Sequence, residues 1–147
     1  MSKIDSRYLF RGKRIDNGTW TIGCLCDDHL GETDRLYIVG IGVKTGAIIP
    51  ATVGQCTGLR DKNGRLIWEG DIIFAKGLEG NDDFVGVIKW YGDDGFTAFS
   101  ICKADDWIRT QGKSPMRMFA NLEQPDYRYE VIGNIFDNPE LIGGDDA

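Results

Sequence analysis

The most informative segment of the sequence is Val53-Gly54-Gln55-Cys56-Thr57-Gly58-Leu59-Arg60-Asp61-Lys62-Asn63-Gly64-Arg65-Leu66-Ile67-Trp68-Glu69-Gly70-Asp71-Ile72-Ile73. At its centre, residues 61–64 have the composition of a tight turn, because Asn63-Gly64 supplies the left-handed backbone positions that such a turn requires. Residues 65–68 leave this turn as a strand, and residues 72–75 form a second, fully apolar strand. The segment therefore predicts short strands joined by tight turns.

A β-hairpin is predicted upstream of this segment. Residues 8–15 and 19–26 are rich in apolar side chains and flank residues 16–18, whose Asn-Gly pair favours a tight turn. Strand alternation places four residues of the second strand on one face, namely Trp20, Ile22, Cys24 and Cys26. The opposite face holds Thr19, Thr21 and Gly23. We expect the face with the tryptophan and the cysteines to be buried.

The second half of the chain also has the pattern of strands. Residues 84–91 and 96–101 flank a Gly-Asp-Asp-Gly loop and predict another hairpin, and residues 127–134 alternate as a last strand. Residues 103–111 and 116–124 lack glycine and proline, and each predicts a short helix.

These elements predict a mainly β protein in two parts. We expect an N-terminal β-hairpin module over residues 1–57 and a small, strongly bent β-barrel of the Src-homology type over residues 58–142, with one or two short helices. A barrel removes the open strand edges that short strands would otherwise expose. Residues 143–147 are expected to form a disordered tail.

The net charge of -6 is unevenly distributed. Residues 1–70 carry 10 basic and 8 acidic side chains, whereas residues 71–147 carry 7 and 15. Such an acidic half repels phosphate backbones, which disfavours nucleic-acid binding over the whole surface. A local basic patch near the N-terminus could still bind nucleic acid or could simply protect a strand edge. It comprises Arg7, Arg11, Lys13 and Arg14.

The cysteines are expected to be reduced and buried rather than bridged, because no apolar signal sequence precedes them. Cys24, Cys26 and His29 could form a zinc site with Cys56 or Cys102 as the fourth ligand. Their spacing matches no zinc pattern, however, and strand packing explains Cys24 and Cys26 more simply. We therefore expect no metal and no cofactor. No apolar run approaches the roughly 20 residues that cross a bilayer, so we expect no membrane partner and a location in the cytoplasm.

The sequence contains no complete catalytic motif. Residues 112–114 read Gly-Lys-Ser, but Trp107 stands where a phosphate-binding loop requires its first glycine. The acidic pairs at 82–83, 93–94 and 105–106 are explained by turns before acid-base chemistry or metal binding. We therefore expect a protein that is not an enzyme.

The central segment strongly resembles the signature of the YopX family of phage and prophage proteins, which runs from Gln55 through Thr57-Gly58-Leu59 and residues 61–64 to residues 69–71. Residues 10–20 resemble the family's opening and residues 129–141 its close. The resemblance implies a mostly β protein with a small barrel in its second half, often oligomeric and encoded among accessory genes. It transfers no catalytic residue. Whether residues 57–71 determine only the fold or also bind a ligand stays open.

These observations lead to two hypotheses of function. The first is a non-enzymatic phage or prophage accessory protein that acts as an oligomeric protein-interaction module, with further copies of itself or a phage or host protein as partner. The alternative is a nucleic-acid-binding small barrel, which the net acidity disfavours. The candidate interaction surface comprises three basic residues around the central turn and two aromatic residues, namely Arg60, Lys62, Arg65, Trp90 and Tyr91.

Overall fold

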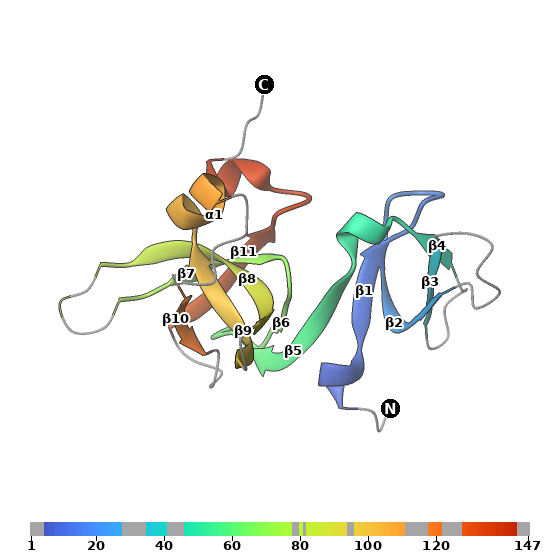
Figure 1. Ribbon diagram of the computed structural model, residues 1–147, viewed down its shortest axis with the longest axis horizontal. Helices are drawn as coiled ribbons and strands as arrows, with labels where there is room; N and C mark the ends of the chain where they lie inside the picture. Colours follow the sequence, from blue (N-terminus) through green and yellow to red (C-terminus); the bar gives the residue numbers. More distant parts are fainter. Residues whose placement is uncertain are drawn as a thin grey trace. The chain divides into compact units, whose positions relative to one another are not determined.

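The computed structural model describes residues 5–27, 35–40, 46–77, 80, 82–93, 96–110, 118–121 and 128–143. It confirms the mainly β class, with two antiparallel sheets (Figure 1). The chain divides into two compact units, Met1–Gly58 and Leu59–Ala147.

The first unit contains η1 (Ser6–Tyr8), β1 (Phe10–Lys13), β2 (Trp20–Asp27), β3 (Leu36–Val39), β4 (Gly46–Ile48), η2 (Pro50–Thr52) and most of β5 (Gly54–Arg60). The second contains β6 (Leu66–Trp68), β7 (Asp71–Ala75), β8 (Phe84–Asp93), β9 (Phe96–Lys103), α1 (Ala104–Thr110), β10 (Met118–Asn121), β11 (Tyr129–Asn134) and η3 (Pro139–Ile142).

The predicted N-terminal hairpin is confirmed by β1 and β2. These strands pair with Lys13 opposite Trp20. In the turn between them, the Asn17 side-chain oxygen accepts a hydrogen bond from the Thr19 N–H at 3.0 Å. Gly18 has a φ of 71°, which is the left-handed conformation expected of the Asn-Gly pair. Local turn chemistry thus explains this hairpin.

The first sheet has six strands in the order β4-β3-β2-β1-β5-β6, so that β5 and β6 form a hairpin, and its strands β1 to β4 curl tightly. Beyond the end of β1, Arg14 forms a β-bridge to Ile48 of β4, and the Ile49 N–H donates to the Lys13 carbonyl at 2.8 Å. Ile38 and Ile48 are completely buried inside the curl. A Cβ on Gly12 would lie only 2.8 Å from the Ile48 side chain. The close packing of the inner face therefore favours glycine at this position.

This curl reverses the predicted faces of β2. Thr21 and Gly23 are buried on the inner face, whereas Ile22, Cys24 and Cys26 are exposed on the outer one. A Cβ on Gly23 would collide with the Val39 carbonyl oxygen, so the strands approach more closely than larger inward side chains would allow. The prediction that the tryptophan-cysteine face forms the core was therefore wrong, and burial is confirmed only for the other two cysteines, Cys56 and Cys102.

The second unit contains a five-stranded sheet in the order β10-β9-β8-β7-β11 (Figure 1). One face of it packs into a core with Ile67 of β6, formed by Ile67, Ile73, Ala75, Ile88, Ile101, Tyr129 and Val131. On the other face, Ile72 and Val87 pack with Ile142 of η3, and Ala104 and Trp107 of α1 lie against them. The sheet is therefore the middle layer of this unit.

Two details of the predicted second unit were wrong. The described strands form open sheets rather than a closed barrel, because β10 and β11 are the two ends of the strand order and do not pair with each other. The helix predicted over residues 116–124 is also absent where the chain is described, since Met118–Asn121 is strand β10 and pairs with β9. The helix predicted over residues 103–111 is confirmed as α1. The last residues of the expected tail, 144–147, lie outside the described chain.

Candidate functional site

The turn at the centre of the YopX-like segment is built around one buried carboxylate. Asp61 is only 4% exposed. Its Oδ1 accepts hydrogen bonds from the backbone N–H groups of Asn63 and Arg65, both at 2.9 Å, and its Oδ2 accepts one from the Val131 N–H at 2.9 Å. Gly64 completes the turn with a φ of 83°. Asp61 thus links the turn to β11.

The same turn covers the outer edge of β11. The Lys62 N–H donates to the Tyr129 carbonyl at 3.0 Å, and the Arg65 guanidinium donates through Nη1 to the Val131 carbonyl at 3.4 Å. Together with the Asp61 carboxylate on the Val131 N–H, these contacts satisfy polar backbone groups that a sheet edge would otherwise leave open. We call residues 61–65 the Asp61 turn. They occupy the position that a further strand would take at this edge.

The charge of Asp61 is stabilised by this environment. Burial alone would raise the pKa of the carboxyl group, but the N–H donors of Val131, Arg65 and Asn63, together with the positive charge of Arg65, outweigh it and lower the pKa below the ordinary value of 3.8. Asp61 is therefore ionised at neutral pH, and its acceptor sites are occupied by the protein's own backbone.

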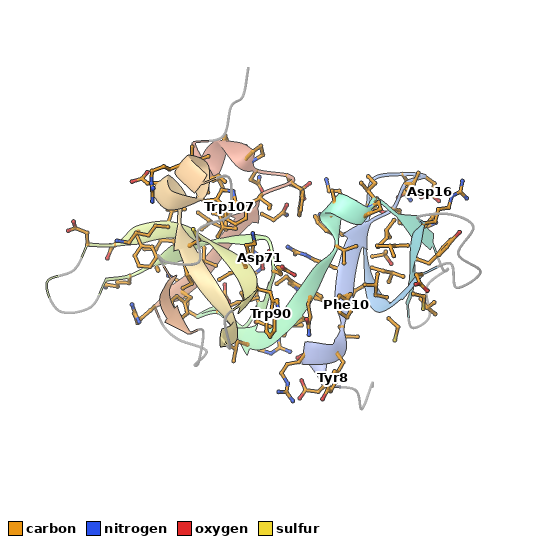
Figure 2. The ribbon with its side chains drawn as sticks, viewed as in Figure 1. Tyr8, Phe10, Asp16, Asp71, Trp90 and Trp107 are labelled. Carbon is orange, nitrogen blue, oxygen red and sulfur yellow. The ribbon has the colours of Figure 1, made fainter. Side chains whose placement is uncertain are left out.

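The residues at the end of the segment also form hydrogen bonds that stabilise the fold. The Asp71 carboxylate, labelled in Figure 2, is buried and accepts the Trp68 N–H at 2.8 Å. Gly70 has a φ of 92°, donates its N–H to the Ile88 carbonyl and accepts the Ile135 N–H on its own carbonyl. These contacts join β6, β7, β8 and the chain after β11, so the segment acts as a structural junction.

The three basic residues of the predicted interaction surface lie together in the hairpin of the Asp61 turn. All three are exposed, yet each contacts its own chain. Arg60 donates through Nη1 to the Gly64 carbonyl at 2.7 Å, Lys62 forms an ion pair with Glu130 at 3.5 Å, and Arg65 bonds to Val131 as described. Their positive groups thus stabilise the turn.

The two aromatic residues of that surface lie on a different strand. Trp90, labelled in Figure 2, is 43% exposed on β8, on the sheet face that also carries buried Ile88. Tyr91 follows it in β8, and its side chain lies outside the described part of the structure. Trp90 therefore remains an exposed aromatic candidate for binding.

A second surface was missed because the faces of β2 were predicted the wrong way round. In the register of the first sheet, Arg11 lies opposite Ile22 and Lys13 opposite Trp20. The Arg11 guanidinium carbon is 4.6 Å from the centre of the Trp20 ring, and the Lys13 ammonium is 5.5 Å from it. Residues opposite each other in an antiparallel pair share a face, so cations and apolar groups are adjacent here.

The apolar part of this surface extends onto β3. Ile22 is 45% exposed and Val39, which pairs with Cys24, is 43% exposed. We call this surface the outer face, and it comprises Arg11, Lys13, Trp20, Ile22, Cys24 and Val39. The alternation was visible in the sequence, but only the curl of the sheet shows which side is outside.

The other two residues of the predicted N-terminal basic patch are paired with neighbouring carboxylates. Arg7 lies 3.1 Å from Asp5, and Arg14 forms two hydrogen bonds to Asp16 at 2.9 and 2.7 Å. The hydrogen bonds from Arg14 lower the pKa of Asp16. The patch therefore divides, and Arg11 and Lys13 are the members that flank Trp20.

Neither a metal site nor a membrane-crossing helix is found where the chain is described. The cysteine and carboxylate side chains of the described residues form no group of three or more that could hold a metal ion. His29, the third residue of the zinc alternative, lies outside the described ranges. Among the described helices, none is long and apolar enough to span a bilayer.

Comparison with known proteins identifies the family. No curated protein gives a significant match to the sequence. Among solved structures, the crystal structure of protein EF1440 from Enterococcus faecalis is similar to this chain, with 21% identity and a TM-score of 0.46 over 90% of this chain and 96% of that one. The family model described as YopX protein matches residues 12–143. The chain therefore belongs to the YopX family.

Proposed function

We propose that this YopX-family chain is a non-enzymatic phage or prophage accessory protein that acts by binding other proteins, first of all further copies of itself. The observation that carries the proposal is the outer face of the first sheet. Ile22 and Val39 present apolar side chains there on paired strands, next to Trp20. An apolar group fixed on a regular sheet and bordered by charges is typical of a protein-binding surface.

The contacts of the buried carboxylates favour a non-enzymatic role. Asp61 accepts three backbone N–H groups and has a lowered pKa, and Asp71 accepts the Trp68 N–H. A general acid or base works best with a pKa near the operating pH and with access to substrate. Asp61 meets neither condition, which supports a structural role for the most distinctive part of the sequence.

Nucleic-acid binding is the rival function, and the contacts favour it less. Arg60, Lys62 and Arg65 would have to exchange their contacts with Gly64 and with β11 for phosphate contacts. The second unit also carries ten basic and seventeen acidic side chains, and its negative charge repels phosphate.

The test is the mass of the purified chain in solution. Light scattering is measured after size separation over about 1–100 µM, the range in which weak to moderate association appears. Each sample is run with and without nuclease, and absorbance at 260 and 280 nm is recorded. We expect a mass above that of one chain that increases with concentration and is unaffected by nuclease. A single-chain mass throughout would refute self-association, and a nuclease-sensitive mass would favour the rival function.

Two variants locate the surface. The double substitution Ile22→Ser and Val39→Ser removes the exposed apolar part of the outer face and should lower the mass toward one chain. Ile132→Ser is the matched control, because Ile132 is also an exposed isoleucine on a strand, but in the second unit. Trp90→Ala examines the other candidate surface. If only Trp90→Ala reduced the mass, the binding surface would lie on β8.

A further inference from the structure

We propose that the outer face of one copy binds the layer formed by α1 and η3 of a second copy, in a head-to-tail contact. This inference rests on the proposed function, because it specifies the partner and the two surfaces that meet. The outer face supplies cations and apolar groups, and the second surface supplies carboxylates and apolar groups.

The second surface is the outward side of α1 and η3, which contact each other in the second unit (Figure 1). The inward side of this layer is occupied, because Ala104, Trp107 and Ile142 pack against the sheet. Other described side chains of the two helices are exposed. We call this exposed surface the acidic layer, and it comprises Asp105, Ile108, Glu140 and Leu141.

The acidic layer has the apolar groups that an interface requires. Ile108 is 48% exposed and Leu141 is 38% exposed. Asp105 and Ile108 are three residues apart in α1 and therefore share a side of the helix. In η3, Leu141 follows Glu140 directly. The layer thus combines apolar groups and carboxylates over two adjoining helices.

Charge complementarity selects this layer as the partner of the outer face. The outer face contains two basic residues, Arg11 and Lys13, and no acidic one. The acidic layer contains two carboxylates, and Arg109 is the basic residue of α1 beside it. Over the complete units the net charges are +1 for residues 1–58 and -7 for residues 59–147. Opposite charges favour contact between different units of two copies.

The same charges disfavour a contact between two outer faces. A two-fold symmetric contact would bring the Arg11 and Lys13 cations of both copies onto one interface, and like charges placed together cost binding energy. A head-to-tail contact avoids this repulsion. Because a pair of copies then retains one unused surface of each kind, the assembly grows into a ring or an open chain.

The experiment uses two full-length variants, each defective in one surface. The outer-face variant carries Ile22→Ser and Val39→Ser, and the layer variant carries Asp105→Lys and Glu140→Lys. The substituted residues are exposed, so both variants should fold. Alone, each should self-associate at least about tenfold more weakly than the unmodified chain. Mixed in equal amounts, they should form a complex of two chains, because the intact layer of one meets the intact outer face of the other.

The complex should contain one copy of each variant and should stop at two chains. Light scattering of each variant and of the mixture measures the mass, and a cleavable tag on one variant shows whether both are present. Circular dichroism and thermal unfolding verify the fold, and Lys13→Gln and Asp105→Asn replace any variant that fails to fold. The unmodified chain should also dissociate as salt is increased, because salt screens the opposed charges.

Two-chain complexes in the mixture alone would support the head-to-tail contact. Unchanged self-association of either variant would overturn it, as would a mixture that stays monomeric although the unmodified chain assembles. In those cases self-association itself survives and only the assigned surfaces fail. A single-chain mass for the unmodified protein, or a mass that nuclease abolishes, would refute the proposed function and this inference together.

Discussion

The Asp61 carboxylate accepts the backbone N–H of Val131 at 2.9 Å, although the two residues are 70 positions apart in the chain. This contact joins the most distinctive turn of the sequence to the last strand of the second unit. The opposite oxygen of the same carboxylate holds the turn itself, through the N–H groups of Asn63 and Arg65. One side chain thus both shapes the turn and anchors it to β11.

Replacing Asp61 by asparagine should destabilise the protein by about 2–4 kcal/mol, the usual cost of disturbing buried hydrogen bonds to a charged group. The asparagine oxygen could still accept from Asn63 and Arg65, but its amide would place a donor against the Val131 N–H. Urea unfolding measures the change in the free energy of unfolding. Asp82→Asn is the control, because Asp82 is exposed, and it should change stability by less than about 0.5 kcal/mol. Equal effects of the two substitutions would contradict a structural role for Asp61.

The stability of the protein should fall at acidic pH in a way that depends on Asp61. Its pKa is lower in the folded protein than the ordinary value of 3.8, so its stabilisation is complete above that value and is lost as the pH falls through the lowered pKa. The difference in unfolding free energy between the unmodified chain and Asp61→Asn should therefore be constant above about pH 5 and shrink below about pH 4. Urea unfolding from pH 7 to pH 2.5 measures it. An equal difference at pH 3 and pH 7 would be inconsistent with a lowered pKa.

The parts of this fold that were predictable from the sequence are those governed by local chemistry. Asn17-Gly18 identified the first hairpin, and residues 61–64 identified the central turn, because backbone conformations in turns depend on neighbouring residues. The basic residues of that turn were also found. The sequence could not show that Lys62 forms an ion pair with Glu130, or that Arg65 donates a hydrogen bond to the Val131 carbonyl, because both partners lie far along the chain.

The errors have a common cause in tertiary structure. Burial of the more apolar side of β2 was the reasonable expectation, but the curl of the sheet places Thr21 and Gly23 on the inside of that strand, and at Gly23 the Val39 carbonyl leaves no room for a side chain. The segment that includes Met118–Asn121 has residues compatible with a helix, yet pairing with β9 makes it a strand. Neither strand pairing nor curvature can be inferred from the pattern of one segment.

The reversed faces of β2 can be tested with two adjacent substitutions. Gly23→Ala should cost about 3 kcal/mol or more, because its Cβ would meet the Val39 carbonyl, which β2 and β3 hold in place. Ile22→Ser should cost less than about 1 kcal/mol, because the side chain is substantially exposed on the opposite face. Thermal and urea unfolding provide the comparison. The expectation from the sequence pattern alone is the reverse order, so a larger loss for Ile22→Ser would restore the original assignment of the faces.

The four cysteines provide a chemical test of both units. Cys24 and Cys26 are exposed, whereas Cys56 and Cys102 are buried and at most 1% exposed. A thiol reagent such as dithionitrobenzoate should therefore react with two thiols in the native protein and with four after unfolding, because burial blocks access to the sulfur. Cys24→Ser and Cys26→Ser should each reduce the rapid phase to one thiol, and Cys56→Ser should leave it at two.

Since Cys24 belongs to the outer face, its reaction should also slow at concentrations at which the chain assembles, and the Ile22→Ser and Val39→Ser variant should lose this protection. Four rapidly reacting thiols in the native protein would contradict the burial of Cys56 and Cys102, and equal rates at all concentrations would place Cys24 outside the interface.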